Sequence, residues 1–282
     1  MSTYMFPGQG SQKIGMGETL FPHFPELLKQ AEDILGYSLT RLCLEDPLQQ
    51  LHQTQYTQPA LYVVNALSYL EKIHVTREKP DYLIGHSLGE YNALYAAGVF
   101  NFTTGLQLVK KRGELMSQAT DGAMAAIVGL KTEMVKALLA EHHLSHVTIA
   151  NDNSYTQAVI SGVKNDVEHA VALFKQAGAI MAVLLKTSGA FHSPLMKSAQ
   201  EQFAHFACDY SFAAPMIPVF ANTTAEPYRP HEIPQKLIEQ ISHPVRWTET
   251  IAYLLAQGET EFEEIGPGKV LTGMVKRIKN GQ

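Results

Sequence analysis

Short runs of apolar residues alternate along the chain with segments whose apolar positions recur every three or four residues. The short runs predict strands and the helically spaced segments predict helices, so the pattern favours an α/β protein. In the first 120 residues we expect strands at Tyr4–Phe6 and Tyr82–Ile84, and helices at Thr57–Ile73, Glu90–Ala97 and Thr103–Gln118. Near the carboxyl end we expect strands at Ile217–Ala221 and Glu261–Ile265, and helices at Trp247–Ala256 and Lys269–Lys279.

The middle of the chain has a distinct order of elements. Its pattern predicts strand, helix, two strands, helix and strand, at Met124–Leu130, Thr132–His142, Val147–Ala150, Ala158–Ser161, Asp166–Gln176 and Ala179–Leu185. This β-α-β-β-α-β order is typical of a ferredoxin-like unit. We therefore expect a small domain at residues 122–187, inserted into a larger α/β domain made of residues 1–121 and 188–282. A ligand-binding cleft is expected between the two domains.

A candidate nucleophile lies on a turn between an expected strand and an expected helix. The segment Gly85-His86-Ser87-Leu88-Gly89 has the G-x-S-x-G pattern of a nucleophile elbow in that setting. Gly85 and Gly89 leave room where Cβ atoms would clash, and the helix N-terminus favours negative charge developing on the Ser87 hydroxyl. A serine that only caps the helix is the alternative, but capping does not require both glycines.

A serine nucleophile needs a base, and His192 is the candidate among the 12 histidines. It stands in the loop that returns the chain from the small domain to the large one, beside the expected cleft. His142, His143 and His146 end an expected surface helix, so we expect them to be solvated. A structural role for His192 stays open. No acid is evident to orient its imidazole, and a main-chain carbonyl is the alternative that would also fix its tautomer.

The loop Gly8-Gln9-Gly10-Ser11-Gln12 directly follows the first expected strand. Its glycines would let the backbone and the Gln9 amide approach a substrate oxygen. It is not a dinucleotide-binding fingerprint, because Lys13 stands where the third glycine belongs. An ordinary glycine-rich turn explains the local pattern equally well.

Arg112 is placed on the apolar face of its expected helix. The residues three and four positions away on either side are Leu108, Val109, Leu115 and Met116. A guanidinium among core residues needs an anionic partner or a long reach to water, and its fork suits a carboxylate held bidentately. That partner is either an Asp or Glu of the protein or a carboxylate of the substrate, such as that of a diacid monothioester.

Composition excludes several classes of function. The 282 residues are 45% hydrophobic and 17% charged, which suits a globular chain with a sizeable core. A net charge of -5 is not the basic footprint of a nucleic-acid-binding protein. Cys43 and Cys208 fit neither a disulfide framework nor a metal cluster, so no metal is expected. The sequence shows no signal peptide and no run near the ~18 apolar residues of a membrane span, so we expect a cytoplasmic protein without membrane or nucleic-acid partners.

Motifs spread over nearly the whole chain carry a family resemblance. They are FPGQGSQ (Phe6–Gln12), TQPAL (Thr57–Leu61), GHSLGE (Gly85–Glu90), KRGELM (Lys111–Met116), GAMAAI (Gly122–Ile127), GAFHS (Gly189–Ser193), HPVRW (His243–Trp247) and EIGPGKVLTG (Glu264–Gly273). Together they resemble the malonyl-CoA:acyl-carrier-protein transacylases, and within them the discrete acyltransferases that serve polyketide synthases in trans. Phe191 before His192 resembles the malonyl-selecting form of its motif.

The resemblance implies an α/β-hydrolase-like large domain with a ferredoxin-like insert. It also implies roles for seven residues at one catalytic centre. These are Ser87 as nucleophile, His192 as base, Arg112 as the clamp on the malonyl carboxylate, Gln9 and the Leu88 N–H at the oxyanion, Gln240 near the active site, and a carbonyl around Asn222 that orients His192.

The implied activity is transfer of a malonyl group from malonyl-CoA to the phosphopantetheine thiol of an acyl carrier protein, by a ping-pong reaction through a malonyl-serine ester. The implied enzyme acts as a monomer without a permanently bound cofactor. Three alternatives stay open. One is an acyl hydrolase that edits acyl carrier proteins, against which Arg112 argues, because family members that have become hydrolases tend to lose it. The others are the same transfer in housekeeping fatty-acid synthesis and a non-catalytic module that binds carrier proteins, which the intact elbow disfavours.

Overall fold

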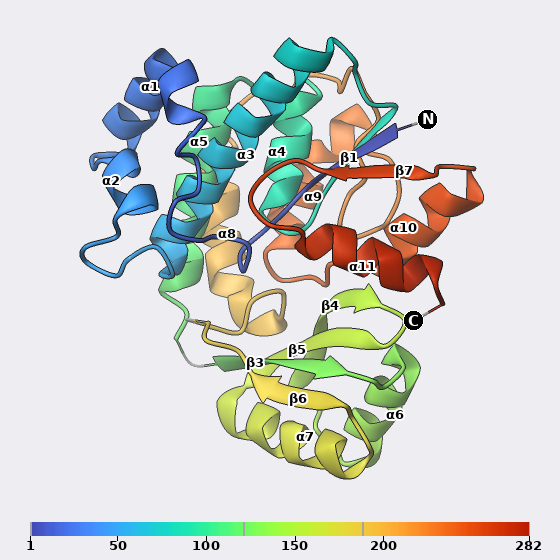
Figure 1. Ribbon diagram of the computed structural model, residues 1–282. Coiled ribbons are helices and arrows are strands. Elements are labelled where there is room, and N and C mark those ends of the chain that lie inside the picture. Colours follow the sequence, from blue (N-terminus) through green and yellow to red (C-terminus); the bar gives the residue numbers. More distant parts are fainter. Residues whose placement is uncertain (1, 121, 188, 282) are drawn as a thin grey trace.

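Two separate sheets organise the chain in the computed structural model, which describes residues 2–120, 122–187 and 189–281 (Figure 1). The larger unit holds a three-stranded parallel sheet in the order β2-β1-β7. The smaller unit holds a four-stranded antiparallel sheet in the order β4-β5-β3-β6. The expected α/β class, with a small unit inserted in a larger one, is therefore confirmed.

The small unit has the expected ferredoxin-like order. Its strands are β3 (Gly122–Val128), β4 (Val147–Ser154), β5 (Gln157–Val163) and β6 (Met181–Leu184), and its helices are α6 (Thr132–Glu141) and α7 (Lys164–Gln176). Alternate side chains of β3, including Ala125 and Ile127, join the core beneath the two helices, as the twofold period of a strand requires. The predicted domain boundaries adjoin residues 121 and 188, which lie outside the described residues, and their positions stay a prediction.

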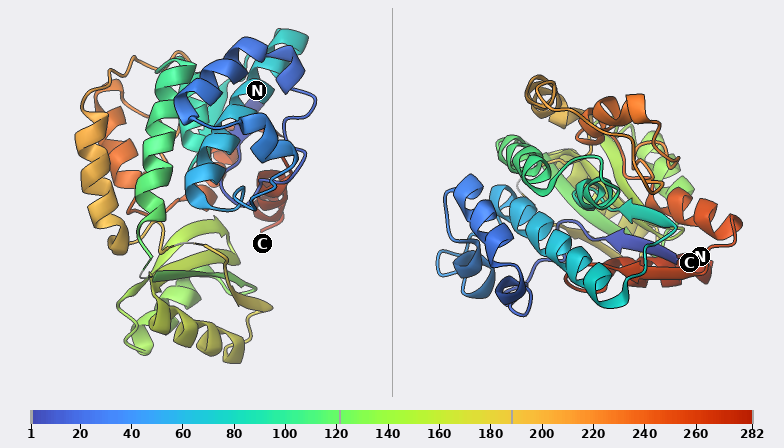
Figure 2. Two further views of the ribbon diagram at one scale, coloured as in Figure 1. Left: turned by 90° about the vertical axis from the view of Figure 1, so that its left-hand side faces the viewer. Right: turned by 90° about the horizontal axis from the view of Figure 1, so that it is seen from above.

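The parallel sheet of the large unit is covered by helices on both faces (Figure 2, right). Its strands are β1 (Ser2–Phe6), β2 (Tyr82–Gly85) and β7 (Glu261–Glu264). Alternation along β1 divides the core, because Tyr4 and Phe6 join the cluster that includes the helices following β1 and β2, while Met5 joins the cluster of the carboxyl-terminal helices. The helices of this unit are α1 (Pro25–Leu35), α2 (Leu39–Leu44), α3 (Thr54–Thr76), α4 (Gly89–Ala96), α5 (Phe102–Ser117), α8 (Lys197–Ala207), α9 (Ile233–Gln240), α10 (Trp247–Ala256) and α11 (Val270–Lys279).

The strand expected at Ile217–Ala221 is wrong. Val219 and Phe220 form only isolated bridges, one with Leu83 of β2 and one with Pro227. Both residues are buried, so the apolar run reflects burial in the core and not a strand paired along its length. Pro218 has no N–H to add to a ladder, and it contributes only its carbonyl, which accepts from the Leu83 N–H.

The two units are joined beside the parallel sheet. Val245, just before α10, bridges Asn151 of β4, and its main chain exchanges hydrogen bonds with Ala150 and Asp152. A pocket at this joint is lined by β4, the loops after β1 and β2, and α11. Within the described ranges, no helix combines the length and apolar character needed to cross a bilayer.

Candidate active site

Ser87 lies on a sharp turn between β2 and α4 and adopts a left-handed φ of 52°. The two glycines of the turn allow close backbone contacts. A Cβ at Gly89 would lie 1.9 Å from the Phe6 carbonyl oxygen, and a Cβ at Gly85 would lie 2.0 Å from the Gly89 carbonyl carbon. The turn therefore needs glycine at both positions, and it presents the Ser87 hydroxyl at the amino end of α4.

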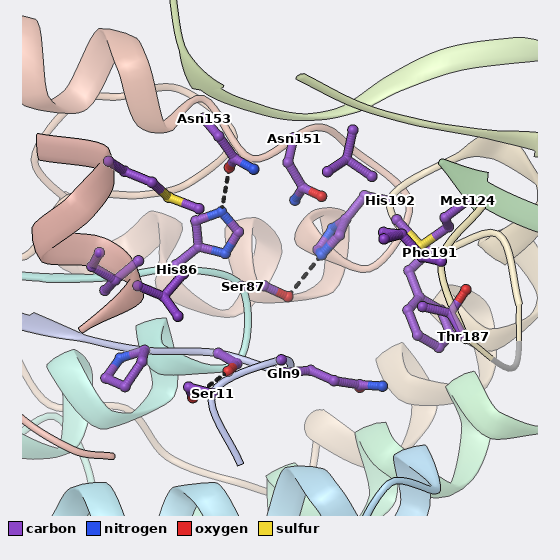
Figure 3. A pocket seen from close by; sticks show the side chains of 18 residues that line it. Gln9, Ser11, His86, Ser87, Met124, Asn151, Asn153, Thr187, Phe191 and His192 are labelled. Atoms are coloured by element: carbon purple, nitrogen blue, oxygen red, sulfur yellow. Dashed lines mark hydrogen bonds between the residues drawn. The ribbon is translucent and has the colours of Figure 1, made fainter. Parts of the chain in front are cut away.

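His192 reaches Ser87 from the loop between β6 and α8 (Figure 3). Its Nε2 lies 2.7 Å from Ser87 Oγ. On the other side of the ring, Nδ1 lies 2.8 Å from the Gln240 carbonyl oxygen and 3.1 Å from that of His243. Carbonyl oxygens only accept, so Nδ1 carries the proton and Nε2 is free to accept the serine proton.

Burial keeps this imidazole neutral. His192 is 3% exposed, and burial, followed by the charge of Arg112, lowers its pKa to about 3. A neutral imidazole is the form that can act as a base.

The expectation that a carbonyl around Asn222 orients His192 is wrong. The Asn222 carbonyl accepts from the Arg246 N–H, and the side chain of Asn222 is bound at the elbow instead. Its Oδ1 accepts from the Ser87 N–H at 2.7 Å, and its Nδ2 donates to the Gly85 carbonyl at 2.7 Å. The carbonyls of Gln240 and His243 thus orient the imidazole, whereas the Asn222 side chain holds the main chain of the nucleophile.

Arg112 is buried in the site with 1% exposure. One terminal nitrogen donates to Gln58 Oε1 at 2.7 Å, and the other donates to Gln240 Oε1 at 2.8 Å and to Ser87 Oγ at 3.1 Å. Its Nε has no partner among the described residues. Neutral amide oxygens thus occupy the positions that a bidentate carboxylate would take.

An ion pair with a protein carboxylate was the alternative for Arg112. None of the ion pairs found within the described residues includes it. Glu90 is the carboxylate whose charge acts on it, and the side chain of Gln240 stands between the two. The guanidinium therefore retains a capacity for one more anion beside the serine.

The loop after β1 packs directly against the elbow. A Cβ at Gly8 would lie 2.4 Å from the His86 carbonyl oxygen, so the loop approaches as closely as glycine allows. The side chain of Gln9 points away from Ser87 (Figure 3), and its Nε2 donates to Thr54 Oγ1 at 3.3 Å. The main-chain N–H groups of Gln9 and Leu88 have no acceptor within the described part of the chain. These two donors, rather than the Gln9 amide, are available to a substrate oxygen.

Apolar and amide side chains complete the pocket around these groups. Met124 and Phe191 lie on the His192 side, and Asn151 and Asn153 come from β4 (Figure 3). Leu185 also lines the pocket. Asn153 Oδ1 lies 2.8 Å from the Nε2 atom of His86, which turns that ring away from Ser87. No cluster of three potential metal ligands occurs among the residues described.

Glu90 is a site residue that the sequence interpretation missed. It lies three positions after Ser87, is 1% exposed, and accepts hydrogen bonds from Asn222, Gln240 and Tyr228. Burial raises its pKa to about 7, although these donors and Arg112 act to lower it. The sequence pattern that could have found it is the one that singled out Arg112, a charged residue on the apolar face of a helix. The residues three and four positions after Glu90 are Ala93 and Leu94.

Comparisons with known proteins match nearly the whole chain. Residues 3–280 match the model of the acyl transferase domain. The polyketide biosynthesis malonyl CoA-acyl carrier protein transacylase PksC of Bacillus subtilis (strain 168) is 56% identical over 280 residues, which are 99% of this chain and 97% of PksC. A crystal structure of malonyl CoA-acyl carrier protein transacylase from Burkholderia pseudomallei has 51% identity and a TM-score of 0.97, covering 100% of this chain and 99% of that one.

A solved complex is also similar to this chain. It holds a holo acyl-carrier protein of a type II polyketide synthase with its malonyl-transacylase, at 39% identity and a TM-score of 0.94, and the match covers 100% of this chain and 94% of that one.

Proposed function

The chain belongs to the acyl transferase family, and on that premise we propose that it transfers a malonyl group from malonyl-CoA to the phosphopantetheine thiol of an acyl carrier protein. The observation that carries the proposal is the 2.7 Å contact between Ser87 Oγ and the neutral His192, beside the buried guanidinium of Arg112. The similarity to PksC and to the transacylase solved with a carrier protein supports the substrate and the acceptor, and the former supports a role in polyketide biosynthesis.

In the first half-reaction, His192 Nε2 takes the Ser87 proton while Oγ attacks the thioester carbonyl of malonyl-CoA. The carbonyl oxygen becomes an oxyanion, to which the free N–H groups of Leu88 and Gln9 donate. The carbon–sulfur bond then breaks, and His192 returns its proton to the CoA sulfur. The malonyl group remains as an ester on Ser87.

The second half-reaction runs the same steps with a different thiol. The phosphopantetheine thiol of the carrier protein gives its proton to His192, and its sulfur attacks the ester carbonyl. The ester bond breaks, and Ser87 Oγ recovers the proton from His192. No group beyond these side chains and main-chain donors is needed to balance either step.

Arg112 supplies both selectivity and orientation in this scheme. The malonyl carboxylate would replace the neutral oxygens of Gln58 and Gln240 on the guanidinium, which gains a charge-assisted bidentate pair. This pair fixes the acyl group with its carbonyl over Ser87 and leaves less freedom for water to attack the ester.

Intact mass measurement tests the proposal. The enzyme is exposed to a mixture of malonyl-CoA, acetyl-CoA and longer acyl-CoAs, and a holo acyl carrier protein is then added. We expect a malonyl adduct that persists until the carrier is added and then moves to the carrier. Apo carrier protein, which lacks the thiol, is the matched control and leaves the adduct in place. Rapid loss of the adduct to water without a carrier would instead identify an acyl hydrolase.

A further inference from the structure

The carboxylate of Glu90 is surrounded by donors from two remote segments. Its Oε1 accepts from the Asn222 N–H at 3.0 Å and from the Tyr228 hydroxyl at 2.5 Å, and its Oε2 accepts from Gln240 Nε2. Three donors on a fully buried carboxylate are the arrangement that suits its ionised form, which only accepts. A protonated carboxyl would itself become a donor, so one of the three contacts would have to be lost or reversed.

Two of these donors belong to residues that also hold Ser87. Asn222 Oδ1 accepts from the Ser87 N–H, and Gln240 Nε2 donates to the Ser87 carbonyl, both at 2.7 Å. The nucleophile's main chain is thus held on both sides by the side chains of two residues that also donate to Glu90, Asn222 through its main-chain N–H and Gln240 through Nε2.

Gln240 connects Glu90 to the remaining catalytic groups. Its Oε1 accepts from Arg112 at 2.8 Å, and its main-chain carbonyl lies 2.8 Å from His192 Nδ1. The bonds from Gln240 Nε2 to Glu90 and to the Ser87 carbonyl together determine which way the amide faces, and with it the acceptor offered to Arg112.

We propose that Glu90 is a positioning residue whose ionised carboxylate holds Asn222 and Gln240 against the elbow, so that its protonation slows acylation of Ser87. This inference rests on the proposed function only for the choice of malonyl-CoA as one substrate. Glu90 touches neither Ser87 Oγ nor the acyl group and acts through its two partners.

The charged and titratable groups that face Glu90 come from three segments. Arg112 faces it from α5, Tyr91 from α4, and Tyr228 from the segment before α9, with Glu239 beyond Tyr228.

Burial outweighs the donors and raises the pKa of Glu90 to about 7, whereas burial lowers the pKa of His192 to about 3. A loss of acylation rate on acidification near neutral pH is therefore assigned to Glu90 and not to protonation of the base.

The test measures the rate of Ser87 acylation from pH 5.5 to 8.5 with two reagents, malonyl-CoA and a serine-directed acyl probe that has no carboxylate. We expect the wild-type rate to fall about tenfold with both reagents as the pH drops through the neutral range. Glu90→Gln should show the low rate at every pH. Tyr228→Phe removes one donor, which raises the pKa of Glu90, so the midpoint should move to higher pH. Glu201→Gln, an acid-to-amide change on the exposed side of α8, should keep the wild-type profile.

The outcomes separate this inference from the proposed function. A folded Glu90→Gln variant with the wild-type rate and profile would overturn the inference, as would a wild-type rate that does not change across this range. If Glu90→Gln fails to fold, the test rests on Tyr228→Phe. A midpoint of its acylation rate against pH that equals the wild-type midpoint overturns the inference. If the probe acylates Ser87 but malonyl-CoA does not, the proposed function fails and the probe profiles alone decide the role of Glu90.

Discussion

Ser87 and His192 meet through a 2.7 Å contact on main chains that both adopt the left-handed region, with φ of 52° and 56°. Such a conformation costs a non-glycine residue about 1–3 kcal/mol and persists only where its surroundings hold it. Here Asn222 and Gln240 bind the main chain of Ser87, and the His192 N–H donates to the Ile241 carbonyl. Strain at both residues is thus balanced by contacts from the segment 222–243, and it places the two side chains within proton-transfer distance.

Replacement of the nucleophile tests the centre most directly. Ser87→Ala removes the oxygen that forms the ester, so we expect no acyl adduct and a loss of transfer by several orders of magnitude. Ser198→Ala, on the exposed side of α8, is the matched control and should retain activity. The intact mass of each variant after exposure to malonyl-CoA shows whether it carries a malonyl adduct. A malonyl adduct on the Ser87→Ala protein would refute the assignment of the nucleophile.

Arg112 is predicted to discriminate between acyl groups. Arg112→Ala removes the guanidinium expected to bind the malonyl carboxylate, so the transition state for malonyl transfer should lose about 2–3 kcal/mol more stabilisation than that for acetyl transfer. The measurement is the ratio of kcat/KM for malonyl-CoA and acetyl-CoA. Lys111→Ala, one position away on the same helix, is the control. Equal losses for the two substrates in Arg112→Ala would contradict the clamp.

The buried histidines predict a pH dependence of stability. Burial lowers the pKa of His192 from 6.5 to about 3, and it lowers the pKa of His86 as well. Below pH 6.5 the unfolded chain binds protons at these two histidines that the folded protein does not, so they lower the free energy of unfolding as pH falls, by at most about 1.4 kcal/mol per pH unit for each histidine. Glu90 acts in the opposite direction, because burial raises its pKa to about 7 and the folded protein binds its proton before the unfolded chain does.

This dependence can be assigned to one residue. In His192→Gln the loss of stability between pH 6.5 and pH 5 should be smaller than in the wild type. His231→Gln changes an exposed histidine and should leave the dependence as it is. Urea unfolding at several pH values measures how the free energy of unfolding changes with pH. An identical change in His192→Gln and the wild type would count against a neutral, buried His192.

Glycine-to-alanine substitution is expected to have opposite effects at the elbow and on an exposed helix. Gly89→Ala would place a Cβ 1.9 Å from the Phe6 carbonyl oxygen, and we expect a loss of about 1–3 kcal/mol together with loss of acylation. Gly273→Ala, on the exposed side of α11, meets nothing within 4 Å and should gain about 0.5–1 kcal/mol from reduced backbone freedom in the unfolded chain. Thermal unfolding compares them, and a stable, active Gly89→Ala protein would show that the turn tolerates a side chain.

The sequence by itself determined the features that depend on local order. The ferredoxin-like unit followed from the alternation of short strands and helices, and Ser87 followed from two glycines between a strand and a helix. Arg112 followed from helical spacing alone. Each helix, strand or turn involved is specified by residues close together in the sequence, so its pattern can be recognised without the tertiary structure.

Tertiary structure alone decided how these parts work together. The bonds from Ser87 to Asn222 and Gln240 join segments 135 and 153 residues apart, and no local pattern specifies such pairs. The carbonyls that orient His192, the direction of the Gln9 side chain and the environment of Glu90 belong to the same class. Each depends on which loops the packed core brings to one place, because hydrogen bonds between remote segments form only after the hydrophobic clusters have fixed the positions of their helices and strands.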